Sequence, residues 1–352
     1  VLYSIRNEEA HSHATPQGAP IAGTMIGQIR QLDPHTPVTM ALLMWDLKNG
    51  VPIEEISAIS GISEQLDVAG FNYHAHRWPA YHAAYPDQPM ICTEQGTFRS
   101  TRECDKTDAA RCHLAITDKN ADSYMAGAAQ WHVCRPDWMS GCFIWTGFDY
   151  YGEPTPYAWP AISSQFGAMD LCGFPKDFYY YYKAWWGKEK LLHIFPHWNG
   201  KPGEKKDVHV FSNCEEVELF LNGRSLGRKT MEPDGYLVWE GIEWEPGVLA
   251  GRGFSEGKEA AVSERRTTGA ACAVRLAEEY QEGEIHIFRA EIVDCEGRIV
   301  PDAEHRLTFT AENGKILGTA NGDPSDHDAP GGSIRHAFGG LAQAIVRGGE
   351  GL

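Results

Sequence analysis

Two short apolar segments of this chain each end in a glutamate, and this repeated pattern constrains the fold more than any other feature. The first segment opens the sequence and stops at Asn7 and Glu8, while the second, residues 89–96, carries Glu94 just before a glycine. In both cases the pattern predicts a buried strand that delivers a carboxylate at its C-terminal end. For either glutamate alone, a loop start or a helix cap is the simpler interpretation, so the pair is the informative observation.

Strand-like and helix-like segments alternate over the first 190 residues. Predicted strands occupy residues 1–8, 37–43, 66–74, 90–94 and 141–147, and predicted helices occupy residues 16–32, 53–62, 78–85, 121–131 and 178–186. Repeated βα units favour a parallel sheet, and α/β barrels carry functional residues at the C-terminal ends of their strands. We therefore expect residues 1–190 to be a partial TIM-barrel catalytic domain, the C-terminal part (strands 4–8) of a (β/α)8 barrel whose earlier strands precede Val1.

After about residue 190 the pattern changes to short alternating runs separated by tight turns. Asn222-Gly223, between two such runs, is a strong hairpin signal because both residues tolerate a positive φ. The runs fall into two cycles, which predicts an immunoglobulin-like β-sandwich over residues 191–268 and a second immunoglobulin-like β-sandwich over residues 269–352. The expected fold class is therefore multidomain, α/β followed by all-β.

Composition narrows the range of partners and cofactors. The 48 acidic and 31 basic residues give a formal net charge of -17, which argues against nucleic acid and an anionic membrane surface and favours a neutral substrate. The nine cysteines are scattered without C-x-x-C spacing, which predicts neither a zinc site nor a disulfide framework. No glycine loop typical of phosphate binding occurs, so we expect no cofactor and no metal. No apolar run reaches the length of a membrane span, so no membrane insertion is expected.

The two glutamates suit the hydrolysis of a glycoside. This reaction needs two carboxyl groups beside the glycosidic oxygen, one protonated to assist the leaving group and one ionised to attack or to activate water. Glu8 and Glu94 are the residues that meet this need, and Asn7 is placed to hydrogen-bond a sugar hydroxyl, although a loop Asn that satisfies backbone groups is an equal alternative. The chain is also rich in aromatic residues, on which the faces of sugars stack.

Three further side chains are candidates for a substrate site. Tyr73 follows the strand between the two glutamates and is placed to donate a hydrogen bond to Glu94. His74 is a candidate for the pocket lining, and it has no partner at the spacing of metal ligands. Trp145 ends the last predicted strand, where it would form the floor of a sugar site. For Tyr73 and Trp145, packing in the core is the alternative interpretation.

Several motifs together resemble glycoside hydrolase family 2, and most closely its bacterial β-galactosidase-like members. They are Ser-Ile-x-Asn-Glu at residues 4–8, Asn-Tyr-His at 72–74, Thr-Glu-x-Gly at 93–96, and the segment Gly-Cys-Phe-Ile-Trp-Thr-Gly-Phe-Asp-Tyr-x-Gly-Glu-Pro at 141–154. The likeness extends over the whole chain, since residues 163–180 and both predicted sandwiches also look like the C-terminal portion of that subgroup.

The resemblance implies roles for individual residues. Glu8 matches the acid/base, Glu94 the nucleophile, and Tyr73 and Trp145 the subsite for the non-reducing sugar. Arg6 departs from the pattern, because the family usually has glycine there. β-Glucuronidases of the family carry an Asn-x-Lys motif after the eighth strand, and residues 146–190, which include Lys176, contain none. This difference favours galactosides.

The sequence thus predicts a retaining exo-acting glycoside hydrolase for terminal β-linked hexosides, with β-galactosides favoured and with the two carboxyls about 5 Å apart. The alternatives are the same chemistry on β-glucuronides or other β-hexosides, and a non-catalytic carbohydrate-binding fragment. The expected partner is an oligosaccharide or glycoside substrate. A homo-oligomer is left open, and a periplasmic or secreted location is slightly favoured. If the first barrel strands precede Val1, the isolated chain should hydrolyse aryl β-galactosides at least ~100-fold more slowly than a full-length parent.

Overall fold

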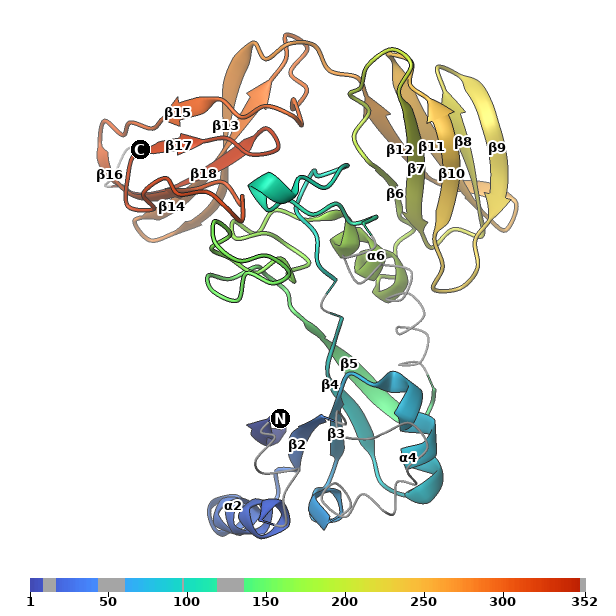
Figure 1. Ribbon diagram of the computed structural model, residues 1–352, viewed down its shortest axis with the longest axis vertical. Helices are drawn as coiled ribbons and strands as arrows, with labels where there is room; N and C mark the ends of the chain where they lie inside the picture. Colours follow the sequence, from blue (N-terminus) through green and yellow to red (C-terminus); the bar gives the residue numbers. More distant parts are fainter. Residues whose placement is uncertain (9–16, 44–60, 97, 119–135, 349–352) are drawn as a thin grey trace. The chain divides into compact units, whose positions relative to one another are not determined.

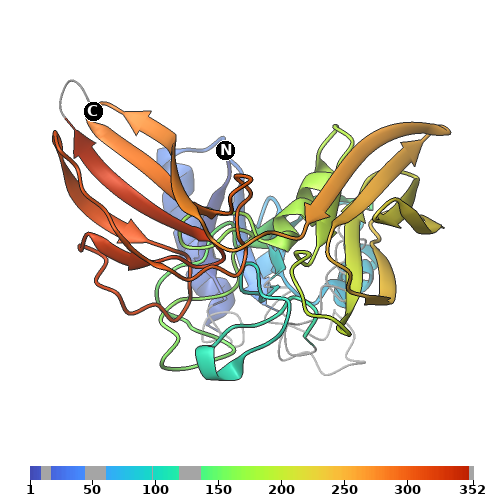
Figure 2. The same cartoon turned by 90° about the horizontal axis from the view of Figure 1, so that it is seen from above.

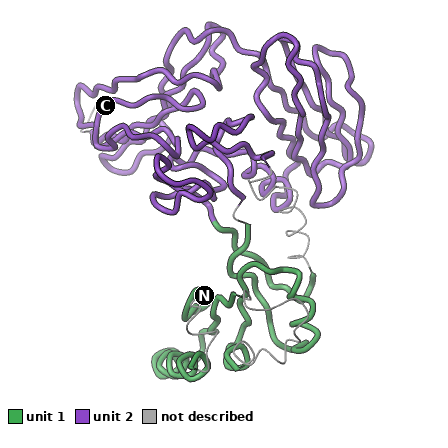
Figure 3. The backbone as a smooth tube through the Cα atoms, in the orientation of Figure 1, with its two compact units in different colours: residues 1–97, 125–145 green, residues 98–124, 146–352 purple. Residues whose placement is uncertain are grey.

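The computed structural model describes residues 1–8, 17–43, 61–96, 98–118 and 136–348. The chain forms two compact units, the first made of Val1–Thr97 and Met125–Trp145, and the second of Phe98–Tyr124 and Thr146–Leu352 (Figure 3). Within the described ranges, the helices are too short or too polar to cross a bilayer.

The first unit is built on a parallel five-stranded sheet in the order β1-β2-β3-β4-β5 (Figure 1). The strands are β1 (Tyr3–Asn7), β2 (Val38–Leu43), β3 (Ala69–Asn72), β4 (Met90–Gly96) and β5 (Met139–Trp145), and the helical segments are α2 (Gly18–Leu32), η2 (Ala75–Arg77) and α4 (Trp78–Ala84). The five predicted strands and their parallel arrangement are thus confirmed, as are the predicted helices at 16–32 and 78–85; the helix predicted at 178–186 is also confirmed, and it lies in the second unit. The helix predicted at 53–62 lies mostly, and the one at 121–131 wholly, outside the described residues.

Burial and close packing within this sheet account for the residue types of its inner strands. In β2 every residue from Val38 to Leu42 is buried, which fits a parallel strand covered on both faces. Gly70 in β3 has no room for a side chain, because a Cβ there would lie 2.6 Å from the carbonyl oxygen of Met40 and 2.6 Å from the hydroxyl of Thr39. In the described part of the chain β1 and β5 are the sheet edges, and they carry exposed aromatic side chains such as Phe143.

The second unit contains two groups of antiparallel strands, coloured from yellow-green to orange and from orange to red in Figures 1 and 2. The first group has the sheets β10-β7-β6 and β12-β11-β8-β9, and the second has β13-β14-β18-β16 and β15-β17. Its elements are η3 (Ala109–Arg111), α6 (Asp177–Trp186), β6 (Leu192–Phe195), β7 (Lys205–Ser212), β8 (Glu216–Leu221), β9 (Arg224–Thr230), β10 (Leu237–Glu243), β11 (Val248–Ser255), β12 (Lys258–Arg266), β13 (Ala273–Glu282), β14 (Ile285–Val293), β15 (Arg306–Thr308), β16 (Gly314–Ala320), β17 (Ile334–His336) and β18 (Leu341–Gly348).

Local sequence rules account for much of this β structure. The predicted hairpin at Asn222 and Gly223 is confirmed, since both residues have a positive φ (50° and 81°) between β8 and β9. Alternate residues of β8 are buried, and they pack with the buried Trp198 and Trp239 in the core of the first sandwich. The β-sandwich prediction is consistent with these sheets after residue 190, whereas the strands β6, β12 and β17 were not predicted.

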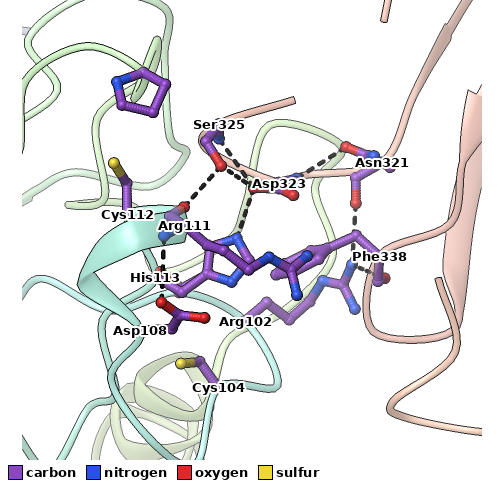
Figure 4. Close-up of polar contacts among 12 residues, drawn as sticks. Arg102, Cys104, Asp108, Arg111, Cys112, His113, Asn321, Asp323, Ser325 and Phe338 are labelled. Atoms are coloured by element: carbon purple, nitrogen blue, oxygen red, sulfur yellow. Dashed lines mark hydrogen bonds and ion pairs between the residues drawn. The ribbon is translucent and has the colours of Figure 1, made fainter. Parts of the chain in front are cut away.

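Buried ion pairs and hydrogen bonds connect the loops of the second unit. The Lys176 ammonium lies 2.6 Å from Asp149 and donates to the carbonyl oxygen of Ser100 at 2.8 Å. Arg102 pairs with Asp170 at 2.7 Å and also donates to the carbonyl oxygens of Asn321 and Phe338, which belong to the second sandwich (Figure 4). The residues between 98 and 190 that are described in this unit thus pack with the sandwiches, and the predicted domain boundary at residue 190 stays a prediction.

Candidate active site

Polar side chains from the C-terminal ends of β1, β3 and β4 converge on the amide of Asn72. Its Nδ2 lies 2.8 Å from Oε1 of Glu8, 3.0 Å from Oδ1 of Asn7 and 3.3 Å from Oε2 of Glu94. Since an amide nitrogen carries two protons, these three acceptors share its donors. The oxygens of Glu8 and Glu94 that contact this nitrogen are therefore at most two hydrogen-bond lengths apart.

The orientation of the Asn72 amide is set by its other end. The hydroxyl of Thr93 donates to Oδ1 of Asn72 at 2.6 Å, which leaves Nδ2 to face the carboxylates. Asn72 is fully buried, and in the sheet register it lies opposite Glu94. A buried amide whose acceptor and donor sides are both engaged is fixed in place.

Glu94 receives a second hydrogen bond from Tyr73. The phenol oxygen lies 2.5 Å from Oε1 of Glu94, so each carboxylate oxygen has its own donor. Hydrogen bonds donated to a carboxylate favour its ionised form. An ionised carboxylate held by two donors is suited to act as a nucleophile rather than as an acid.

The backbone at the strand ends is irregular where the site lies. Glu8, Tyr73 and His74 all have a positive φ, near 50°, which is uncommon for residues other than glycine. The register between β1 and β2 shifts between Ser4 and Asn7, and the register between β3 and β4 shifts at Asn72. Such bulges and left-handed residues redirect side chains and are frequent at functional sites.

The remaining predicted residues are His74, which directly follows Tyr73, and Trp145, which ends the strand beside β4. Burial lowers the pKa of His74, with further lowering by His76 and Arg77, while the charge of Glu8 opposes the shift, so the imidazole is neutral near pH 7. Trp145 ends β5 opposite Gly96, and its side chain is about one-third exposed. Of the predicted site residues, Glu8, Glu94, Asn7 and Tyr73 are thus joined through hydrogen bonds to Asn72 or to Glu94. The roles of all six predicted residues stay predictions.

Two residues of the cluster were not among the predicted site residues. Asn72 closes an apolar strand segment, and Thr93 precedes Glu94 in the next strand. Both residues stand in motifs that carry the family resemblance, Asn-Tyr-His at 72–74 and Thr-Glu-x-Gly at 93–96, and Asn72 is also a polar residue at the end of a run that is otherwise apolar. In the ranges that the structure describes, no group of three or more His, Cys, Asp or Glu side chains is arranged to hold a metal ion.

Comparisons with known proteins place this geometry in context. The family model described as glycoside hydrolase family 2 C-terminal domain 5 matches residues 262–351, and a model for a domain of unknown function, DUF4982, matches residues 203–261. The β-galactosidase BoGH2A of Bacteroides ovatus is 35% identical over 349 residues, which cover 92% of this chain and 40% of the relative. A β-glucuronidase of Formosa agariphila is 31% identical over 246 residues, which cover 64% of this chain and 25% of the relative.

Solved structures agree over nearly the whole chain. A β-glycosidase from Bacteroides vulgatus matches 99% of this chain and 47% of its own length, with a TM-score of 0.80 and 26% identity. A glycosyl hydrolase family 2 member from Bacteroides cellulosilyticus matches 99% of this chain and 46% of its own, with a TM-score of 0.82 and 24% identity, which is a likeness of fold alone. The chain thus spans less than half the length of these relatives.

Proposed function

Because this chain belongs to glycoside hydrolase family 2, we propose that it carries the catalytic carboxylates of a retaining, exo-acting β-glycosidase that acts on terminal hexosides. The observation that carries this proposal is the Asn72 amide, which binds Glu8 and Glu94 at once. Retaining glycosidases separate their two carboxyls by roughly 5–5.5 Å, whereas inverting enzymes leave roughly 6.5–9.5 Å for a water. Two oxygens bound to one nitrogen fit the first spacing.

The proposed mechanism is a double displacement. Glu94 attacks the anomeric carbon and forms a glycosyl ester, while Glu8 donates its proton to the glycosidic oxygen as the bond to the aglycone breaks. Glu8 then takes a proton from water, whose oxygen attacks the anomeric carbon and releases Glu94. Tyr73 and Asn72 hold Glu94 in place through their hydrogen bonds, and this positioning is what the strained strand ends supply.

We also propose that the five strands of the first unit correspond to strands 4–8 of a TIM barrel, and that the two sandwiches are immunoglobulin-like. The support for the barrel is the sequential order of five parallel strands with polar side chains at their C-terminal ends. In this arrangement Asn7, Tyr73, His74 and Trp145 would line the subsite that binds the non-reducing sugar.

The choice between sugars needs one correction. Residues 146–190 lack an Asn-x-Lys tripeptide, but two occur later, at Asn199-Gly200-Lys201 between β6 and β7 and at Asn313-Gly314-Lys315 where β16 begins. The absence of that motif from residues 146–190 is therefore only weak support for galactosides. The preference for β-galactosides is now supported mainly by the name of the Bacteroides ovatus relative, and β-glucuronides are the second candidate.

The test is covalent trapping in the longest natural protein that carries this chain. Activated 2-deoxy-2-fluoro derivatives of β-galactose and β-glucuronic acid should be compared, and we expect the galactoside to label the peptide that contains Glu94. The Glu94→Gln variant should take no label, and Glu103→Gln, an exposed glutamate in the second unit, should be labelled like the unchanged protein.

Each other outcome has a defined meaning. A label delivered only by the glucuronic acid derivative would keep the mechanism and change the substrate. A label on a residue other than Glu94 would contradict the assignment of the nucleophile. Reversible binding without any adduct in either series would favour the non-catalytic carbohydrate-binding function.

A further inference from the structure

Two cysteines that are far apart in the sequence lie together at one end of the second sandwich. Cys272 precedes β13, and Cys295 follows β14. Among the cysteines that the structure describes, these two alone are exposed, whereas the others are buried or partly buried. Both are therefore accessible to a reagent in solution.

The backbone holds the two residues at the same end of one antiparallel strand pair. Ala273 and Val293 form the last pair of the β13–β14 ladder, and the amide of Cys272 donates to the carbonyl oxygen of Val293 at 2.8 Å. Cys295 lies in the turn that follows, which is closed by a hydrogen bond of 2.9 Å from the amide of Asp294 to the carbonyl oxygen of Arg298. Neither cysteine needs a change of strand register to meet the other.

The side chain of Asp294 accepts hydrogen bonds from both segments that carry the two cysteines. Its Oδ1 accepts hydrogen bonds from the amides of Glu296 and Arg298, both at 3.0 Å, and its Oδ2 accepts one from the amide of Gly269 at 2.9 Å. The turn that carries Cys295 and the linker that leads to Cys272 are thus tied to one carboxylate. The two thiols are hydrogen-bonded to each other, and this bond, in which the Cys295 thiol donates to the sulfur of Cys272, together with the charge of Cys272 raises the pKa of Cys295.

We propose that Cys272 and Cys295 are the site of an intramolecular disulfide bond. The oxidant is a low-molecular-weight disulfide such as oxidised glutathione. The thiolate of one cysteine attacks it and releases one glutathione thiolate, and the second cysteine then displaces the other glutathione. In total two protein thiols lose two protons and two electrons, an S–S bond forms between them, and the S–S bond of the reagent is reduced to two thiols.

The position of this bond gives it a structural use. β13 is one of the two edge strands of its sheet, and nearly all of its ten residues are exposed. A bond between residues 272 and 295 would close the segment that contains both β13 and β14, which limits the freedom of the unfolded chain and keeps the edge strand paired. Spacing along the sequence gave no sign of it, because the two cysteines meet only when the hairpin has formed.

The experiment is disulfide mapping of the folded chain. The reduced protein is treated with oxidised glutathione at mildly alkaline pH, alkylated, digested without reductant and analysed by mass spectrometry. We expect one cross-linked pair of peptides containing Cys272 and Cys295, two hydrogens lighter than the two free peptides together. Cys272→Ser and Cys295→Ser should each abolish the pair, whereas Cys104→Ser, at a partly buried thiol, should leave it unchanged.

Three results would overturn the proposal. One is glutathione attached to both cysteines as stable mixed disulfides, the second is covalent dimers as the main product, and the third is free thiols at both positions after prolonged oxidation. A second measurement is hydrogen exchange of the β13 amides, which should slow on oxidation in the unchanged chain and stay the same in Cys272→Ser. Equal exchange before and after formation of the bond would contradict the proposed stapling of β13.

Discussion

In the first unit the buried Asn72 binds two carboxylates that stay partly accessible to solvent, whereas in the second unit Arg102 and Asp170 are both buried and bind each other. Around Asn72 the backbone adopts unusual conformations at Glu8, Tyr73 and His74. Around Arg102 the partners are carbonyl oxygens of the second sandwich and the rings of Phe174 and Phe338, about 5 Å away.

The difference lies in what the polar groups leave available. In the first unit the hydrogen bonds orient carboxylates that can still meet a substrate. In the second unit each nitrogen of the Arg102 guanidinium donates to a protein acceptor, and His113 likewise contacts Asp323 at 2.9 Å (Figure 4). Substitutions in the first cluster should therefore cost activity, and substitutions in the second should cost stability.

The largest expected effect is the loss of hydrolysis in Glu94→Gln. The amide keeps the size of the side chain but cannot attack the anomeric carbon, so kcat on the best aryl β-hexoside should fall by roughly 10⁴-fold or more, about 5.5 kcal/mol. Steady-state kinetics of the longest natural protein that carries this chain would measure it. The midpoint of thermal unfolding should change little, and a variant with near-normal kcat would remove Glu94 from the mechanism.

The next effect is on the stability of the second unit. Arg102→Met leaves Asp170 as an unpaired buried carboxylate, which should lower the free energy of unfolding by about 3–5 kcal/mol. Urea unfolding of this chain would show it. The control is Arg111→Met, because Arg111 forms a solvent-exposed pair with Glu304 and should cost less than about 1 kcal/mol. Equal losses in the two variants would refute the distinction between the two clusters.

A pH effect should appear in the first sandwich. Burial in β7 lowers the pKa of His209 from its ordinary value of 6.5 to about 4. Between these pH values the His209 imidazole is protonated in the unfolded chain and neutral in the folded chain. The free energy of unfolding therefore falls as the pH drops from about 6.5 towards 4, by about 3 kcal/mol for this group. Unfolding measured against pH should become less steep in His209→Phe, whereas His305→Phe, at an exposed histidine, should keep the full slope.

How much the sequence predicted depends on the range of the interactions. The strand ends with Glu8 and Glu94, and the hairpin at Asn222, follow from local patterns and were predicted. The amide of Asn72 was missed because its acceptors come from strands 64 and 22 residues away, and a single Asn in an apolar run has many uses. The contact of Arg102 with Phe338 joins residues 236 positions apart, which no local pattern reports.

The register of the first sheet could not be predicted from the sequence either. The bulges that turn Asn7 and Asn72 towards each other depend on the packing of neighbouring strands, not on the apolar pattern of one strand. The cysteine spacing likewise gave no sign that Cys272 and Cys295 meet. Sequence reasoning thus identified the carboxylates but not the groups that orient them.

The smallest expected change in stability tests that orienting role directly. Thr93→Val removes the hydroxyl that donates to Oδ1 of Asn72, which should cost about 1 kcal/mol of unfolding free energy. Without that donor the amide is free to turn its oxygen towards the carboxylates, so kcat should fall about 10-fold, equivalent to about 1.4 kcal/mol. Thr93→Ser keeps the hydroxyl and should restore kcat.

Thr39→Val is the matched control for this last variant. The Thr39 hydroxyl is buried in the same sheet and donates to the carbonyl oxygen of Val68 at 2.8 Å, away from the carboxylates. Its loss should reduce stability by a similar amount and leave kcat unchanged, because no group of the Asn72 cluster depends on it. If both valine variants lowered kcat equally, the effect would come from a loosened sheet, and the orientation of Asn72 would not be the property that Thr93 controls.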